Sequence, residues 1–191
     1  MNIHGDRILL RAIEESDLPQ LHQWANDPEV WHLLDGWHFP SSSAFMREWF
    51  AGLNADHRHQ RFAIEVQDIG LTGTANLVQI DWKNRNAFHG IMIGDVRHRR
   101  QGYGSDTIRT IMRYAFEELN LHRLETAIIE YNHPSLHTYI DKLGWKKEGL
   151  SRQWYFRNNR YWDRILLGIT RDDYRSQKDS NRTTDTPHTE G

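Results

Sequence analysis

Residues 91–104 read IMIGDVRHRRQGYG, and this stretch decides the fold expected for the chain. Its first part, residues 91–96, contains apolar and β-branched side chains, which predicts a buried strand. Four basic residues follow, and Gly102 and Gly104 come after them. Apolar residues then recur at helical spacing from Ile108 onward, so the sequence predicts an amphipathic helix directly after the glycines.

A strand, a basic glycine loop and a helix in this order predict a phosphate site. The first amides of a helix lack an internal partner and lie at the positive end of its dipole. Glycine lets the backbone approach an anion closely, and the arginines add positive charge. The stretch does not fit a P-loop, and Thr107 stands where a dinucleotide fingerprint needs a third Gly or Ala. We therefore expect a phosphate-bearing ligand of another kind.

The composition narrows the class of protein. A chain of 191 residues suits one domain with a sizeable core. A net charge of −2 argues against general nucleic-acid binding, and the lack of cysteine excludes disulfides, Cys-based zinc sites and a Cys-acyl intermediate. The N-terminus has no signal pattern, and no apolar run approaches the roughly 18 residues of a membrane span. We expect a cytoplasmic enzyme without a membrane partner.

The apolar pattern predicts one mixed α/β domain. Strands are predicted at residues 7–13, 61–67, 72–82, 87–96, 122–130, 145–157 and 160–169. Residues 30–39 are predicted to form a loop or short helix, and longer helices are predicted at residues 17–26, 43–53, 105–119 and 134–142. The domain covers residues 1–174, and residues 175–191 are expected to be a disordered tail because they carry no large apolar side chain.

Several motifs within residues 7–174 together resemble the RimJ/RimL-type branch of the GNAT superfamily, the coenzyme A-dependent N-acetyltransferases. Residues 99–104 match the Arg/Gln-x-x-Gly-x-Gly/Ala signature of that superfamily. Residues 90–95 and 114–123 are similar to its strand before the loop and to its helix end. Its Asn…Ser/Ala…Tyr…Lys-Leu-Gly-Phe…Glu-Gly ending is matched by Asn132, Ser135, Tyr139, Lys142, Leu143, Gly144, Trp145, Glu148 and Gly149, with Trp in place of Phe.

The resemblance implies the GNAT fold, a mostly antiparallel seven-stranded sheet with splayed central strands and about four helices. It implies direct transfer of acetyl from acetyl-CoA to a primary amine. A backbone N–H near residues 93–95 would polarise the thioester carbonyl, and Tyr139 would protonate the departing thiolate as a catalytic acid. The cofactor-binding residues that it implies are Asp95, Val96, Arg97, Arg99, Arg100, Gln101, Gly102, Tyr103, Gly104, Ser105 and Asn132.

One departure from the family pattern concerns the general base. Many relatives carry Glu where this chain has Phe88, and the adjacent His89 is expected to point to the opposite face of an ideal strand. Glu65, Asp81 and Glu130 on neighbouring strands are candidates for the general base. Since the sequence does not choose among them, the general base stays unassigned. The resemblance places Trp31, Asp35, Trp37 and Trp49 where this fold builds its acceptor pocket, although they fit ordinary packing equally well. The predicted amine-binding residues are Trp31, Asp35, Trp37 and Glu130.

The acceptor remains open among several classes at this stage. We favour a small molecule, such as a polyamine, an amino sugar, an antibiotic amine or an amino acid. A protein N-terminus is one alternative, and a non-catalytic acyl-CoA-binding module, favoured by Phe88, is another. His133 and His137 have helical metal-ligand spacing but no third ligand, so no metal is expected. The late tryptophans suggest a possible homodimer contact.

Overall fold

The computed structural model describes residues 1–36 and 39–184, with side chains up to residue 179. The described residues form one eight-stranded sheet with the order β1-β2-β3-β4-β5-β6-β8-β7. Strands β5 and β6 pair in parallel, and the other neighbours pair antiparallel. The strands are β1 (Ile3–His4), β2 (Ile8–Arg11), β3 (Gln60–Val66), β4 (Gly70–Asp81), β5 (Asn86–Ile93), β6 (Arg123–Ile129), β7 (Lys146–Arg157) and β8 (Arg160–Thr170).

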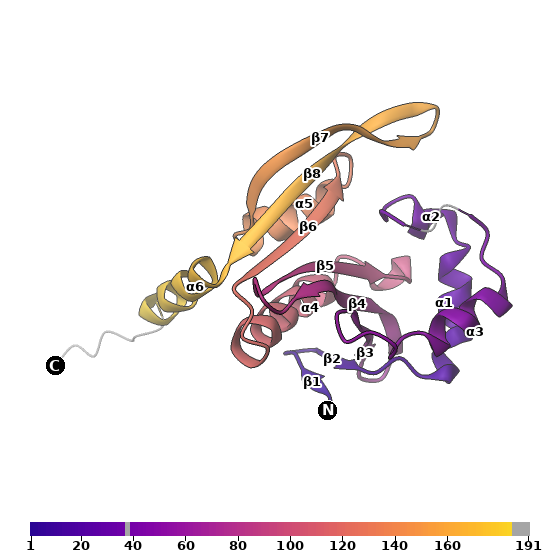
Figure 1. Ribbon diagram of the computed structural model, residues 1–191, viewed down its shortest axis with the longest axis horizontal. Coiled ribbons are helices and arrows are strands. Elements are labelled where there is room, and N and C mark those ends of the chain that lie inside the picture. The colour runs from indigo at the N-terminus through magenta and orange to yellow at the C-terminus, as the bar shows by residue number, and fades with distance from the viewer. Residues whose placement is uncertain (37–38, 185–191) are drawn as a thin grey trace.

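Six α-helices occur in the described part of the chain, and two of them continue as π-helical turns. None of these helices is long and apolar enough to cross a membrane. Asp27 accepts a hydrogen bond from the Glu29 amide and so caps the short helix at Pro28. The helices are α1 (Leu18–Ala25), α2 (Pro28–Trp31), α3 (Ser43–Ala51), α4 (Tyr103–Arg113, then Tyr114–Glu118), α5 (His133–Leu136, then His137–Lys142) and α6 (Arg171–Thr184), as Figure 1 shows.

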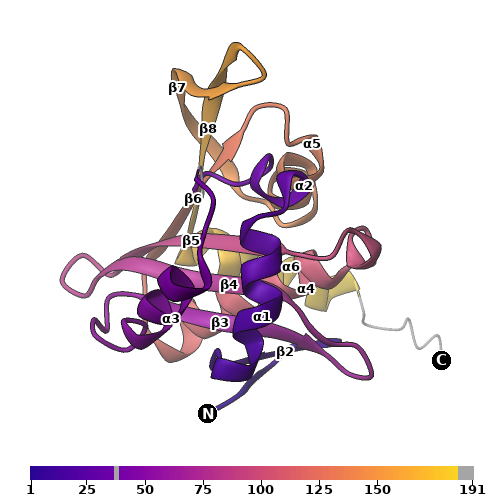
Figure 2. The same cartoon turned by 90° about the vertical axis from the view of Figure 1, so that its right-hand side faces the viewer.

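Helices cover both faces of the sheet (Figure 2). Successive side chains of a strand point to opposite faces, and apolar residues on each face are buried by helices. On one face, α1 and α3 close a small core around Leu21, Trp24, Met46, Ala63 and Met92. On the other face, α4 and α5 close a larger core. Its fully buried side chains include Leu10, Ile64, Leu77, Ile111, Leu124 and Trp145. Each central strand therefore presents different residues to two separate layers of helices.

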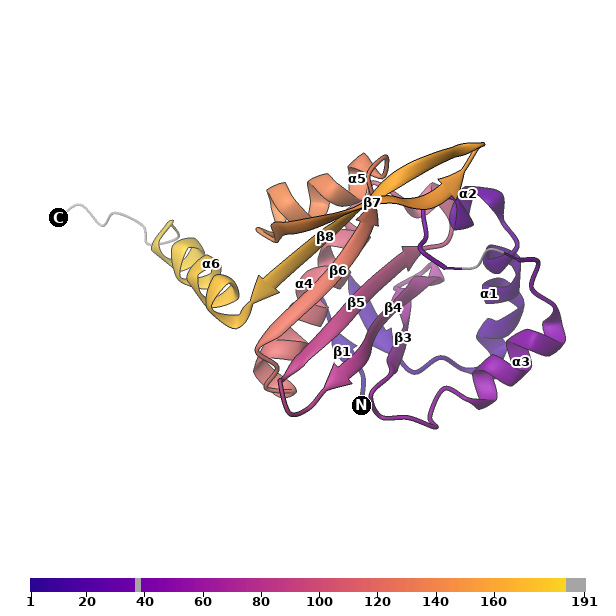
Figure 3. The same cartoon turned by 45° about the horizontal axis from the view of Figure 1, so that its top comes forward.

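The sheet opens between its two central strands. β5 pairs with β6 at Asn86–Arg123, Ala87–Leu124 and Phe88–Glu125, and no pairing follows, although both strands continue. Figure 3 shows the two strands side by side at one end and apart at the other. The pairing register of β4 and β5 shifts between Val78 and Asp81 of β4. Within this β4 segment, Gln79 adopts a φ of 54°. This opening is the structural basis of the site described below.

The predicted fold class, a mixed and mostly antiparallel sheet with splayed central strands, is confirmed. The sheet has eight strands instead of the predicted seven, because β1 pairs with β2 at Ile3–Leu10 and His4–Leu9. A strand of two residues is too short to show a periodic pattern. The helix count also exceeds the prediction of about four, mainly because α2 and α6 are additional.

The prediction of a disordered tail is wrong for residues 175–184, which extend helix α6. Thr170 and Asp173 form a capping box, in which the Thr170 hydroxyl accepts from the Asp173 amide at 3.2 Å and the Asp173 carboxylate accepts from the Thr170 amide at 3.0 Å. Tyr174 and Lys178 both bind Glu117, at 2.7 and 2.5 Å. Tertiary contacts thus stabilise a helix whose own composition is polar. Residues 185–191 lie outside the described residues.

Candidate functional site

The loop between β5 and α4 exposes the start of a helix. Two of its residues have left-handed backbone, Arg100 with a φ of 60° and Gly102 with a φ of 90°. The first helical hydrogen bond runs from the Asp106 amide to the Gly102 carbonyl, at 3.0 Å. The amides of residues 103–105 precede that bond, so they have no partner inside the helix. These amides and the helix dipole fit an anion such as a diphosphate.

A cavity of about 510 Å³, here called the cofactor cavity, lies between this loop and α5. Basic side chains dominate its polar wall, and Arg99 is fixed there by a 3.2 Å hydrogen bond from its Nε to the Ile93 carbonyl. The residues of the loop and of α5 that line it are His98, Arg99, Arg100, Gly102, Gly104, Ser105, Asn132, Pro134, Ser135, His137, Thr138, Tyr139 and Lys142. The chemistry of this wall fits a ligand with several phosphate groups.

Five residues of the predicted cofactor set do not line this cavity. Asp95 caps the short helical turn Val96–His98 and pairs with Arg97 at 2.6 Å, which also lowers the pKa of its carboxyl to about 2. Val96 is exposed, and Gln101 donates to the Arg97 carbonyl. Tyr103 is buried with the guanidinium of Arg7 over its ring, at 4.6 Å. The side-chain contacts of Asp95, Arg97, Gln101 and Tyr103 stabilise the loop, so we expect these residues to reach a cofactor through the backbone.

A second cavity of about 310 Å³, here called the acceptor cavity, lies in front of β3, β4 and β5. The segment 33–36 and Trp49 of α3 enclose it from the helical side. Both cavities share one wall at the opening of the sheet. The residues common to the two are Leu33, Leu34, Ile91, Met92, Asn132, Ser135 and Tyr139. The arrangement allows two ligands to meet at the splayed end of β5.

Tyr139 lies at this junction and keeps its proton. It is only 3% exposed, and it packs edge-to-face on Trp145 with the ring centroids 5.0 Å apart. Burial raises the pKa of its hydroxyl well above the ordinary value, and a hydrogen bond with Thr126 opposes this only in part. The hydroxyl is therefore a neutral proton donor at any physiological pH, as an acid for thiolate requires.

Asn132 connects α5 to the segment after α2. Its Oδ1 accepts from the Ser135 amide at 3.3 Å, and its Nδ2 donates to the Leu33 carbonyl at 3.4 Å. It therefore caps α5 and positions Tyr139 on the next turns of that helix. The predicted contact of Asn132 with the pantetheine arm stays a prediction, and its place in the wall of both cavities is compatible with it.

His89 is fully buried beside the junction and is neutral. Its Nδ1 lies 2.9 Å from the Asn76 carbonyl, which can only accept, so Nδ1 carries the proton. Its ring centroid lies 6.0 Å from that of Tyr139. Burial lowers the pKa of the imidazole to about 4, although the hydrogen bond with Asn76 acts in the opposite direction. This ring lies among the core side chains on the α4 face, opposite to Met92.

We expect His89 to make the protein acid-sensitive. Its folded pKa of about 4 lies below the ordinary 6.5, so the unfolded chain binds the proton more readily. The contribution of His89 to the free energy of unfolding is fully present above pH 6.5. It is lost as the pH decreases toward 4, which lowers the free energy of unfolding by roughly 3 kcal/mol. Urea unfolding across this range should show a shallower decrease for His89→Gln than for the unchanged protein. If the free energy of unfolding decreased equally in both proteins, His89 would not be the source of the acid sensitivity.

The carboxylates predicted as base candidates are engaged elsewhere. Glu65 pairs with Arg11 at 2.5 Å, and Asp81 accepts from the Lys83 and Asn84 amides in the β4–β5 turn. Glu130 accepts from the Asp163 amide at 3.0 Å. None of the three lines either cavity, so the structure adds no support for a role as base, and the role of Glu130 in amine binding stays a prediction.

Only some of the predicted amine-binding residues line the acceptor cavity. Asp35 lines the acceptor cavity, and its role in amine binding stays a prediction. Trp31 does not, and instead lies under the guanidinium of Arg157, whose carbon is 5.1 Å from the ring centroid. Trp37 lies outside the described residues. Arg61 and Asn76 line the cavity but were missed, because polar residues on a strand carry no sequence signal that separates a cavity wall from solvent.

Comparisons with known proteins support one family. Residues 7–146 match the family described as Acetyltransferase (GNAT) domain. The chain is 29% identical over 170 residues to the SPbeta prophage-derived uncharacterized N-acetyltransferase YokL of Bacillus subtilis, covering 89% of this chain and 93% of that protein. It is 26% identical over 172 residues to Spermidine N(1)-acetyltransferase of Vibrio cholerae, covering 89% and 96%.

Solved structures agree with this assignment. The spermidine N-acetyltransferase from Vibrio cholerae in complex with CoA and spermine superposes with a TM-score of 0.79 at 26% identity, covering 89% of this chain and 99% of that chain. A dodecameric structure of the same enzyme gives a TM-score of 0.77 at 26% identity, covering 91% and 99%. The matched domain, the opened sheet and the basic cavity lead to one conclusion: the chain belongs to the GNAT acetyltransferase family and is an N-acetyltransferase that uses acetyl-CoA.

Proposed function

We propose that this enzyme acetylates the primary amine of a small molecule in the junction between the cofactor cavity and the acceptor cavity. The observation that carries this proposal is the shared wall, where Tyr139 borders both cavities. The acceptor cavity is bounded by the sheet on one side and by residues 33–36 and Trp49 on the other. A cavity of about 310 Å³ that is walled on these two sides suits a small amine better than a folded protein surface.

The cofactor-binding assignments are part of this proposal. The free amides of residues 103–105 would hold the diphosphate, with charge from Arg99 and Arg100. The backbone near residues 93–95 and Asn132 would hold the pantetheine arm at the opening. When bound, acetyl-CoA supplies a thioester as the acetyl donor. The Tyr139 hydroxyl holds the proton that the sulfur needs, and its raised pKa keeps that proton in place beforehand.

Three further proposals concern the family branch, the cellular location and the self-association of the chain. We assign the chain to the RimJ/RimL-type branch on the motifs at residues 114–123 and 142–145. Cytoplasmic location is also proposed, in keeping with the lack of cysteine in the sequence. Self-association is proposed through the β7–β8 hairpin, where Trp154, Phe156 and Tyr161 are exposed, whether as a homodimer or as a larger ring.

The direct test is the release of CoA from acetyl-CoA in the presence of single amines. Polyamines, amino sugars, amino acids and short peptides with a free N-terminus should each be supplied separately. We expect release with at least one small amine and none above background with the peptides. Release with peptides alone would assign the enzyme to protein N-termini. Tight binding of acetyl-CoA without release on any amine would favour a binding module.

A further inference from the structure

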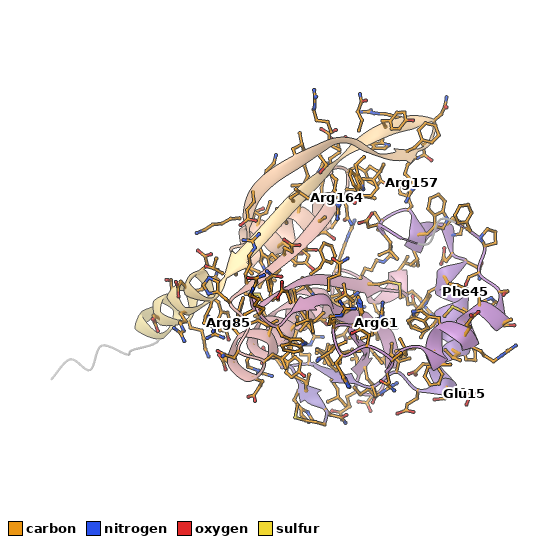
Figure 4. All side chains as sticks on the ribbon, viewed as in Figure 1. Glu15, Phe45, Arg61, Arg85, Arg157 and Arg164 are labelled. Carbon is orange, nitrogen blue, oxygen red and sulfur yellow. The ribbon has the colours of Figure 1, made fainter. Side chains whose placement is uncertain are left out.

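Arg61 brings a positive charge into the acceptor cavity without a partner in the described part of the chain. It lies on β3, is half-buried and lines the cavity. Burial lowers the pKa of its guanidinium, and no carboxylate opposes this effect. Figure 4 labels Arg61 among the central strands, apart from Arg157 and Arg164 on the β7–β8 hairpin. Arginine stays cationic in proteins, so this site holds an uncompensated charge.

The pairing register directs Arg61 to the face that α1 and α3 cover. Ala63, two residues along β3, packs in the small core of that face, and residues two apart share a face. Arg61 pairs with Asn76 of β4, and Asn76 pairs with Gly90 of β5. These three residues therefore form a row across β3, β4 and β5, and its last member lies on the strand that borders the junction.

Asn76 adds a second unsatisfied polar group to this row. Its Oδ1 is buried and has no hydrogen-bond partner among the described residues. Its amide lies over Gly90, where a β-carbon would come within 3.0 Å of the amide nitrogen. Arg61 could have donated to this oxygen but does not, so neighbouring donor and acceptor groups both remain available to a ligand. Unpaired polar groups in a half-buried site are costly unless a ligand binds them.

The other charge in the acceptor cavity does not offset Arg61. Among the described residues that line it, the remaining charged side chain is Asp35. The Arg164 guanidinium lies 3.5 Å from the Asp35 carboxylate and offsets some of its charge. A polycationic acceptor would therefore meet the unpaired charge of Arg61 with only this shared carboxylate to bind it, whereas an anionic group would match the planar guanidinium.

We propose that the acceptor amine carries an anionic group, a carboxylate or a phosphate, and that the Arg61 guanidinium binds this group. This inference rests on the proposed function, because it concerns the acceptor of the same site. It makes Arg61 a specificity-determining residue that selects among amines without taking part in proton transfer. The class of substrate it indicates is a small amine that also carries an anion, such as an amino acid or an amine with a phosphate group.

Matched amines test this inference. The assay compares ω-amino acids of increasing length with the alkylamine, the diamine and the aminoalkylphosphonate of equal length. We expect the unchanged enzyme to prefer an anionic amine, and the ratio of carboxylate to phosphonate to identify the anion. Arg61→Gln should lower kcat/KM for that amine about 30-fold, as loss of a charge-assisted hydrogen bond predicts, and should change kcat/KM for the alkylamine less than about 3-fold.

Two further variants and a binding measurement control for folding. Arg61→Lys keeps the charge and should restore part of the preference. Arg47→Gln, at an exposed position on α3 outside both cavities, should change nothing. Calorimetry with the preferred amine and no acetyl-CoA should show weaker binding to Arg61→Gln than to Arg61→Lys.

The two proposals fail in different ways. Preference for a diamine, unchanged by Arg61→Gln, would overturn the role of Arg61 and leave acetyl transfer to a small amine intact. An equal loss of kcat/KM on every amine would also overturn it. If no amine supports CoA release, the proposed function fails, and the assignment of Arg61 fails with it.

Discussion

Replacing Tyr139 by Phe is expected to lower kcat about 100-fold, because the substitution removes the proton donor from the junction of the two cavities. The shape of the side chain is retained, so the edge-to-face packing on Trp145 should persist. Affinity for acetyl-CoA should change less than about 2-fold, since the hydroxyl acts on a charge that develops during the reaction. Steady-state kinetics and calorimetry measure the two quantities separately.

A matched tyrosine controls for the loss of a hydroxyl as such. Tyr114 bonds to Gln60 at 3.2 Å through its hydroxyl and lines neither cavity, so Tyr114→Phe should leave kcat unchanged. Unaltered turnover by Tyr139→Phe would remove Tyr139 as the acid. Equal losses in the two variants would point to a general effect on folding instead.

Placing Val at Gly102 is expected to weaken acetyl-CoA binding on the order of 1,000-fold. Gly102 has a φ of 90°, which β-branched residues strongly disfavour, and a new side chain would stand where the loop must approach phosphate. The loss corresponds to about two charge-assisted hydrogen bonds from the free amides. A β-carbon there would meet no protein atom closer than 3.5 Å, so the effect should not arise from a clash within the fold.

Gly70 provides the control for backbone strain. It has a φ of 87°, nothing within 4 Å of an added β-carbon, and a position at the first residue of β4, outside the lining of both cavities. Gly70→Val should therefore destabilise the protein by a similar amount, about 1 to 3 kcal/mol, without changing acetyl-CoA affinity. Calorimetry and urea unfolding of both variants separate binding from stability. Equal affinities of the Gly102→Val variant and the unchanged protein would contradict the assignment of the loop.

Local patterns made the core of the fold predictable. The strand, loop and helix at residues 91–119 follow from apolar spacing and two glycines, and the structure confirms their order. The strand ends at Ile93 instead of the predicted residue 96, because residues 96–98 form a short helical turn with Val96 exposed. The tail could not be predicted, because α6 depends on contacts of Tyr174 and Lys178 with the distant Glu117. The two-residue strand β1 depends likewise on its partner. Elements stabilised by tertiary contacts leave little trace in their own sequence.

The same limit applies to the site. The Tyr139 position followed from a motif, and the structure places it in the wall of both cavities. The carboxylates proposed as bases were candidates because they lie on neighbouring strands, but strand neighbourhood does not reveal which partners a side chain finds. Glu65 forms an ion pair with Arg11, and Glu130 accepts a hydrogen bond from the Asp163 amide. Arg61 became visible only once the pairing register and the lack of a partner were known.

The most direct test of the central claim is a crystal structure of the enzyme with CoA bound. We expect the diphosphate within hydrogen-bond distance of the amides of residues 103–105, and the sulfur beside the Tyr139 hydroxyl at the opening between β5 and β6. A diphosphate held elsewhere, or a sulfur remote from Tyr139, would contradict the claim that donor and acceptor meet at this junction.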